Sequence, residues 1–220
     1  MSFGPEAIDQ PGALRPPDPP RFGQASLDRL RRILPHDDGS LPTGDFRLAA
    51  VLVPLYVADG SVHVVLTQRT ENVRTHRGQV SFPGGGWEPQ DETLRETSLR
   101  EAEEEVGLDP DDVEVLGVLE DLPTAVSSFR IRPFVGVIPH PYEFVHQAME
   151  VAYVFAPKLE IFADESLRRT ELRERDGHQF EIFYYDVDGA MVWGATARML
   201  VRLIEVLSGP IPGANDFVDR

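Results

Sequence analysis

Residues 86–108 have the sequence GWEPQDETLRETSLREAEEEVGL, and this stretch decides the fold. It predicts a loop followed by a helix over residues 93–106. On that helix Glu101, Glu104 and Glu105 are spaced i, i+3 and i+4, so their side chains project from one face. Crowded carboxylates repel one another unless a hard divalent cation neutralises them, and oxygen ligands of this kind suit Mg2+ or Mn2+. The alternative is a solvated acidic helix.

The spacing of the specified residues favours a site over a solvated helix. A charge run does not require glycine, arginine and glutamate at set positions, whereas this stretch places them in the order Gly86, Glu92, Arg100, Glu101, Glu104, Glu105 and Gly107. The pattern resembles the Nudix box, G-x5-E-x7-R-E-U-x-E-E-x-G-U, in which U is a small or aliphatic residue. The resemblance implies an α+β fold, an α/β/α sandwich around a mixed β-sheet, with the box as loop, helix and loop.

The resemblance also implies a metal-dependent pyrophosphohydrolase that cleaves a phosphoanhydride bond. Carried over by position, Glu101, Glu104 and Glu105 are metal ligands, and Gly86 offers its backbone carbonyl. Arg100 cannot bind a cation and is expected to hold a box carboxylate, Glu92 or Glu101, in place. The catalytic group is thus Glu101, Arg100 and Glu92. Glu101 is the favoured general base, and two carboxylates outside the box are alternatives, Glu120 and Glu150.

The lead-in to the box, residues 65–85, has the sequence VLTQRTENVRTHRGQVSFPGG. It resembles the signature of the coenzyme A diphosphatase branch of the family, L-L-T-x-R-[SA]-x3-R-x3-G-x3-F-P-G-G, with Val65 and Thr70 as conservative departures. The coenzyme A signature has its glycine pair at Gly84 and Gly85 and its next acidic residue at Asp91, whereas the general box has its glycine at Gly86 and its acidic residue at Glu92. The metal ligand is therefore expected to be the backbone carbonyl of either Gly85 or Gly86.

The lead-in carries cations beside the glycines, and these suit an anionic substrate. Arginine donates several hydrogen bonds in a plane, which matches phosphate. The predicted substrate-binding residues are Arg69, Arg74, Arg77, His76 and Gln79. Arg69 and Arg74 have the alternative of pairing with acidic residues of the same surface. His76 has the alternative of a structural hydrogen bond, and Gln79 that of satisfying the loop backbone.

Together these features predict hydrolysis of coenzyme A or an acyl derivative to adenosine 3′,5′-bisphosphate and 4′-phosphopantetheine, with Mg2+ or Mn2+. The alternatives are another nucleoside diphosphate derivative, such as ADP-ribose or NADH, and a non-catalytic nucleotide-binding module of the same fold. Three later segments also resemble the branch. They are residues 121–136, residues 150–152 and residues 193–197.

Composition restricts the partners. Thirty-seven acidic residues against 21 Lys and Arg give a net charge of -16, which disfavours nucleic acid or an anionic membrane as the main partner. The chain has no Cys, so a disulfide or a thiolate metal site is excluded. No signal peptide or membrane span is recognisable, and a cytoplasmic location is expected. A homodimer is plausible because such assemblies are common.

One domain is predicted at residues 26–208, between a Pro-rich arm at 1–25 and a tail at 209–220. The arm's prolines disfavour helix and central strand, so it is expected to be extended or disordered. Ser26 is a plausible N-cap for a helix to residue 34, and apolar spacing predicts a last helix over 195–207. Residues 158–175 are expected to form a helix and a loop. Strands are predicted at 47–57, 62–67, 80–82, 113–119, 130–138, 151–155 and 180–185.

Overall fold

The computed structural model describes residues 20–37, 39–70, 78–124, 128–175 and 177–209. Its main sheet is built on β1 (Arg47–Ala58) and β8 (Phe129–Val137), which are parallel from Arg47↔Phe129 to Leu55↔Val137. The other pairings of this sheet are antiparallel and add β2 (Ser61–Val64), β5 (Gly84–Gly86), β6 (Glu114–Val118) and β7 (Leu122–Pro123). The mixed sheet predicted from the sequence is therefore confirmed.

Two smaller antiparallel sheets complete the β structure. One has the order β4 (Val80–Ser81), β3 (Leu66–Arg69) and β9 (Val151–Phe155). The other has the order β10 (Arg168–Arg175), β11 (His178–Val187) and β12 (Ala190–Trp193). The single strand predicted at 62–67 is divided between β2 and β3 at Val65, whose N–H donates to the Pro54 carbonyl at 2.9 Å.

The prediction of a helix and a loop for residues 158–175 is wrong in its second half. The segment begins with the short helices α3 (Glu160–Ala163) and η2 (Glu165–Leu167) and then forms β10. Charged residues dominate β10, because most of its side chains are exposed and only one sheet partner, β11, is present among the described residues. An exposed charged strand lacks the apolar alternation by which strands are recognised.

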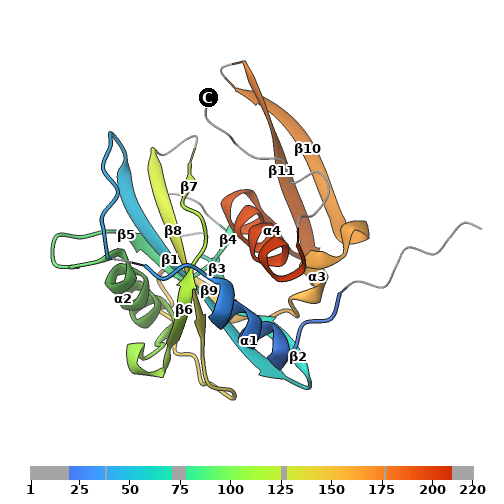
Figure 1. The fold of residues 1–220 in the computed structure, drawn as a ribbon, viewed down its shortest axis with the longest axis horizontal. Helices are drawn as coiled ribbons and strands as arrows, with labels where there is room; N and C mark the ends of the chain where they lie inside the picture. The colour runs from blue at the N-terminus through green and yellow to red at the C-terminus, as the bar shows by residue number, and fades with distance from the viewer. Residues whose placement is uncertain (1–19, 38, 71–77, 125–127, 176, 210–220) are drawn as a thin grey trace, which may run out of the picture.

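The helices cover both faces of the main sheet. Helix α2 (Leu94–Val106) packs on one face through Ala102 and Val106, and helix α4 (Gly194–Ser208) packs on the other through a core that includes Leu200 and Ile204. Figure 1 shows α2 and α4 on opposite sides of β1 and β8. This arrangement confirms the predicted α+β sandwich. In the part of the chain that the structure describes, no helix has the length and apolar character needed to cross a bilayer.

The ordered fold begins before the predicted boundary at residue 26. Phe22 is buried, and α1 (Gln24–Ile33) starts two residues ahead of Ser26. Ser26 lies inside the first turn, where its Oγ accepts from the N–H of the N-cap residue Gly23 at 3.3 Å. The end of the predicted arm is thus part of the domain. Residues 1–19 and 210–220 lie outside the described residues.

Local sequence sets both ends of α2. The Thr93 hydroxyl caps the helix by accepting from the Glu96 N–H at 3.2 Å. Gly107 ends it with φ 67°, in the left-handed region where glycine is unstrained. The helix predicted over 93–106 is confirmed. Its apolar face packs on β1, and β5 lies against its neighbouring face, so the position of the carboxylates on that face is fixed as well.

Candidate active site

The glycines of β5 bring the backbone against the carboxylates of α2. The N–H of Gly84 donates to Glu105 Oε2 at 3.2 Å. A Cβ at Gly85 would lie 2.6 Å from the Glu101 carboxylate, closer than van der Waals contact allows. A Cβ at Gly86 would meet nothing within 4 Å. Glycine at position 85 is therefore required for the placement of Glu101, whereas position 86 has room for a side chain.

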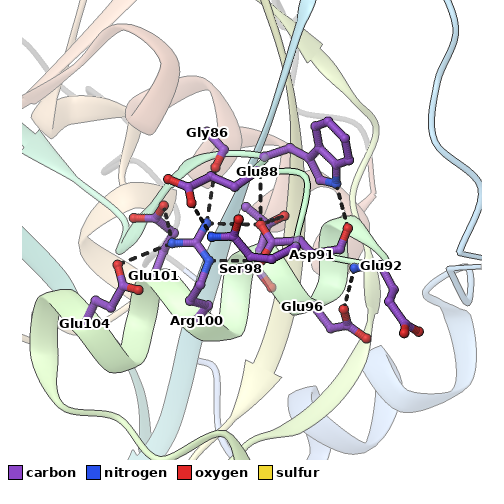
Figure 2. Close-up of polar contacts among 12 residues, drawn as sticks. Gly86, Glu88, Asp91, Glu92, Glu96, Ser98, Arg100, Glu101 and Glu104 are labelled. Carbon is purple, nitrogen blue, oxygen red and sulfur yellow. Dashed lines mark hydrogen bonds and ion pairs between the residues drawn. The ribbon is translucent and has the colours of Figure 1, made fainter.

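Arg100 lies at the centre of the box and contacts three carboxylates (Figure 2). Its Nε and Nη2 donate to the two oxygens of Asp91 at 2.9 and 3.0 Å. Its Nη1 donates to Glu101 at 2.9 Å and to Glu104 at 3.3 Å, and Nη2 also reaches the Gly86 carbonyl at 3.3 Å. The expected contact between Arg100 and Glu101 is present.

Of the two carboxylates expected as partners of Arg100, Glu101 is contacted and Glu92 is not, and Asp91 accepts the two-oxygen contact instead. The Asp91 side chain is only 4% exposed and also accepts from the Thr97 hydroxyl at 2.9 Å. Glu92 is exposed, and Figure 2 shows its carboxylate pointing away from Arg100. Its N–H donates to Glu96 at 2.6 Å. The signal for Asp91 was present in the sequence, because the lead-in signature has its acidic position there.

Burial and hydrogen bonds shift the pKa of Asp91 in opposite directions. Burial raises the pKa of its carboxyl, but donation from Arg100, the Glu88 N–H and Thr97 outweighs burial, so the pKa lies below its usual value. The Asp91 hydrogen bond is also the main cause that raises the pKa of Arg100. Both groups therefore stay charged at neutral pH, and the pair is a fixed anchor for the rest of the network.

A second arginine, Arg69 at the end of β3, joins the box to a carboxylate outside it. Its Nη1 lies 3.4 Å from Glu105 Oε1, and its Nη2 lies 3.4 Å from Glu150 Oε2. Of the two interpretations of Arg69, phosphate binding and pairing with acidic residues, the structure shows the pairing. Its Nε is buried and has no hydrogen-bond partner among the described residues.

The remaining predicted residues divide into two groups. Glu120, one alternative general base, pairs with Arg202 of α4 at 2.9 Å, whereas Glu150 reaches the box through Arg69. The Gln79 carbonyl accepts from the Arg69 N–H at 2.9 Å, so its backbone supports the lead-in. Arg74, His76 and Arg77 lie outside the described residues.

One of the later segments that resemble the coenzyme A branch has a structural role. Arg132 of β8 donates to both oxygens of Asp121, at 2.9 and 3.2 Å, and to Asp37 at 2.7 Å. These contacts hold the connection between α1 and β1 against β8. Asp121 and Arg132 are part of the sequence resemblance, whereas Asp37 is not and lies 95 residues before its partner Arg132.

The carboxylates nearest the glycines are chemically suited to a hard cation. Burial raises the pKa of Glu101, and it raises that of Glu105 to about 7, because ionised carboxylates are poorly solvated there and repel one another. In the described residues these groups contact arginines, and no cluster of three or more His, Asp or Glu is preassembled around a common point. The donors are all oxygen, and a divalent cation would relieve the repulsion, so the residues fit Mg2+ or Mn2+.

The site consists of a strand of glycines beside a helix that carries carboxylates, within an α+β sandwich. This arrangement defines a class of enzymes that hydrolyse phosphoanhydride bonds. Residues 46–185 match the NUDIX domain family. The chain is 39% identical over 165 residues to Nudix hydrolase 15, mitochondrial, of Arabidopsis thaliana, a match that covers 72% of this chain and 58% of that longer protein. It is 38% identical over 164 residues to the uncharacterized Nudix hydrolase NudL of Pectobacterium atrosepticum, covering 74% and 83%.

Among solved structures, a MutT/nudix family protein from Enterococcus faecalis aligns with a TM-score of 0.48 and 16% identity, over 76% of this chain and 64% of the other. The chain belongs to the Nudix hydrolase family. It is a pyrophosphohydrolase that acts on nucleoside diphosphate derivatives, and its family generally uses divalent metal ions.

Proposed function

We propose that the protein hydrolyses coenzyme A or acyl-coenzyme A to adenosine 3′,5′-bisphosphate and 4′-phosphopantetheine or its acyl derivative. One observation carries the proposal. Two residues of the lead-in that resembles the coenzyme A branch contact Glu105 of the box helix, which accepts from the Gly84 N–H at 3.2 Å and lies 3.4 Å from Arg69. The substrate signature and the catalytic helix are therefore parts of one site.

The metal, Mg2+ or Mn2+, would be held by Glu101, Glu104, Glu105 and the carbonyl of Gly85 or Gly86. When bound it would supply a polarised water and would neutralise charge that develops on the phosphoryl oxygens. Arg100 keeps Glu101 oriented, and Asp91 keeps Arg100 in place. A metal-binding side chain that is held by a second residue, which is itself held by a third, is typical of sites in which that side chain must keep one rotamer.

The reaction forms one P–O bond and breaks another. Water attacks one phosphorus of the anhydride, the bridging P–O bond breaks, and the departing phosphate takes the electron pair. Glu101 is the proposed general base that accepts the proton of the water, because its carboxylate lies against Gly85 and is held by Arg100 at 2.9 Å. Glu150 is the outside carboxylate nearest the box and is the alternative base.

The substrate phosphates need donors in addition to the metal. The buried Nε of Arg69 is one candidate, because none of the described residues is its hydrogen-bond partner while the rest of the guanidinium is held by Glu105 and Glu150. Arg74, Arg77 and His76 remain proposed phosphate ligands from their place in the lead-in. Gln79 remains a proposed contact to a polar group of the substrate.

A panel of coenzyme A, acetyl-coenzyme A, ADP-ribose and NADH with Mg2+ or Mn2+ tests the proposal, with products identified by mass. Cleavage of coenzyme A to the two named products is expected. Turnover of ADP-ribose or NADH without cleavage of coenzyme A would reject the substrate and retain the hydrolase. The Glu101→Gln variant is the control for catalysis, since a folded variant that has lost turnover excludes a contaminating enzyme.

A further inference from the structure

An exposed stack of side chains crosses the sheet formed by β10, β11 and β12. Arg169, Tyr184 and Trp193 are direct partners on the three strands. The rings of Tyr184 and Trp193 are parallel, with an interplanar angle of 5° and centroids 5.9 Å apart. The guanidinium carbon of Arg169 lies 4.2 Å from the Tyr184 centroid. Trp193 remains 36% exposed, although a tryptophan is usually well buried.

The stack lies beside the lead-in to the box. Strand β12 lies against β4, and Thr196, at the start of α4, donates to the Val80 carbonyl at 3.0 Å. Strand β4 runs through Phe82 and Pro83 directly into Gly84. Figure 1 shows β3 and β4 in the middle of the molecule, between α2 and the sheet that carries β10 and β11. The strand that ends at Trp193 therefore lies against β4, which ends at Ser81, three residues before Gly84.

The alternation of the strands places the stack on the side of the β10–β12 sheet that faces away from α4. Val80 and Val192 are buried in the core beneath α4, so their neighbours Ser81 and Trp193 project to the opposite side. Ser81 lies opposite Thr67, and their hydroxyls are 3.2 Å apart. Two residues along β3, Arg69 reaches Glu105 of the box. Trp193 and Ser81 thus both project away from α4, from two strands that lie against each other, and Ser81 is paired with β3, the strand that ends at Arg69.

A flat aromatic surface on a strand next to the lead-in suits a nucleobase. Tyr184 is on the middle strand, with the Arg169 guanidinium over its ring and Trp193 parallel to it on the other side, so the ring face left open is the outer face of Trp193. Such a face stacks on a planar heterocycle, and the arginine adds a cation to the stack. We propose that Trp193, backed by Tyr184 and Arg169, binds the adenine ring of the substrate, so that the nucleotide extends from the box across Ser81 to Trp193. This inference rests on the proposed function only in requiring an adenine nucleotide, and it holds for coenzyme A, ADP-ribose and NADH alike.

Tryptophan fluorescence tests the proposal. The chain has two tryptophans, Trp87 and Trp193, and Trp87 donates to the Asp91 carbonyl at 3.0 Å, so the wild type is compared with Trp193→Phe, which removes only the emission of Trp193. Adenosine 3′,5′-bisphosphate and AMP are the adenine products expected from coenzyme A and from ADP-ribose or NADH, and neither has an anhydride bond to consume. We expect at least one of them to quench the wild-type emission saturably and to quench Trp193→Phe much less. We expect 4′-phosphopantetheine, which lacks the base, not to quench either protein. Absence of quenching by both nucleotides, or equal quenching of the wild type and Trp193→Phe, would overturn the proposal.

Kinetics with the substrate identified by the panel provide a second test. Trp193→Ala is expected to raise KM about tenfold while kcat changes less than about twofold, because stacking contributes binding and not chemistry. Met191→Ala is the matched control, since Met191 is 41% exposed two residues earlier on the same side of β12 and lies outside the stack. An unchanged KM in Trp193→Ala, or the same change in both variants, would contradict the proposal. If Trp193→Ala leaves KM unchanged and converts a dimer to a monomer in sedimentation, the stack is a subunit interface, and this result also contradicts the proposal.

Discussion

Arg100 donates two hydrogen bonds to Asp91, of 2.9 and 3.0 Å, one to each carboxylate oxygen. The neighbouring Glu92, one residue closer to the helix, faces solvent. The distinction matters because the third nitrogen of Arg100 holds Glu101, the proposed general base, at 2.9 Å. The orientation of Glu101 therefore depends on a buried aspartate that does not itself lie against the glycines.

Replacing Asp91 tests this dependence directly. Asp91→Asn keeps the shape of the side chain but removes the charge that fixes Arg100, so kcat should fall about 10- to 100-fold, as for other residues that orient a metal ligand. Glu92→Gln is the matched control on the adjacent residue and should change kcat by less than about twofold. Thermal denaturation of both variants separates misplacement of Glu101 from unfolding. Loss of activity in Glu92→Gln with Asp91→Asn active would reverse the assignment.

The two candidate glycines give a second matched pair. In Gly85→Ala the new methyl group would occupy the space of the Glu101 carboxylate, which lies 2.6 Å from the Cβ position. Because Glu101 is flexible at its end, we expect a folded protein with kcat reduced at least about tenfold. Gly86→Ala meets open space and keeps its carbonyl, so it should retain most activity. Steady-state kinetics and circular dichroism of both variants measure this, and equal activities would contradict it.

Arg69 offers a test of positioning against substrate binding. It contacts Glu105 and Glu150 at 3.4 Å each, and its removal leaves two carboxylates unscreened beside Glu101. Arg69→Met should therefore lower kcat, because Glu105 loses the group that positions it, and lower the Mn2+ concentration needed for half-maximal activity, because the unscreened carboxylates attract the cation more strongly. Glu150→Gln should have a smaller effect, because Glu150 is 45% exposed and the contact to Glu105 remains. A rise only in the substrate KM of Arg69→Met would show that the arginine acts on the phosphates instead.

The sequence was most informative where local rules act. The α2 helix was predictable because Thr93 caps it, Gly107 ends it and its apolar residues recur at helical spacing. The parallel pairing of β1 with β8 was not predicted, because its register joins residues about 80 apart, and the family resemblance implied only that the sheet is mixed. Strand β10 was missed because charged exposed strands have no apolar period. The partners of Arg69 and Arg100 depend on how a loop and a helix meet, and spacing along the chain does not determine that.

Glu105 makes stability and metal binding depend on pH. Burial raises its pKa to about 7, above the value near 4.5 expected in the unfolded chain. The folded protein therefore binds more protons than the unfolded chain between these values. Linkage then requires that the contribution of Glu105 to stability is largest below pH 4.5 and falls as pH rises through about 7. A shift of this size corresponds to roughly 3 kcal/mol in the metal-free protein.

Urea denaturation in EDTA at several pH values between 5 and 8 measures this effect as the difference between the wild type and Glu105→Gln. The variant has no ionisable group at this position, so the difference isolates Glu105 from carboxylates such as Asp91, whose lowered pKa acts at more acidic pH. Mn2+ should reverse the trend, because it binds the ionised carboxylate and should stabilise the wild type more at pH 7.5 than at pH 5.5. A wild type and a Glu105→Gln variant with parallel pH profiles would show that Glu105 ionises at its ordinary pKa.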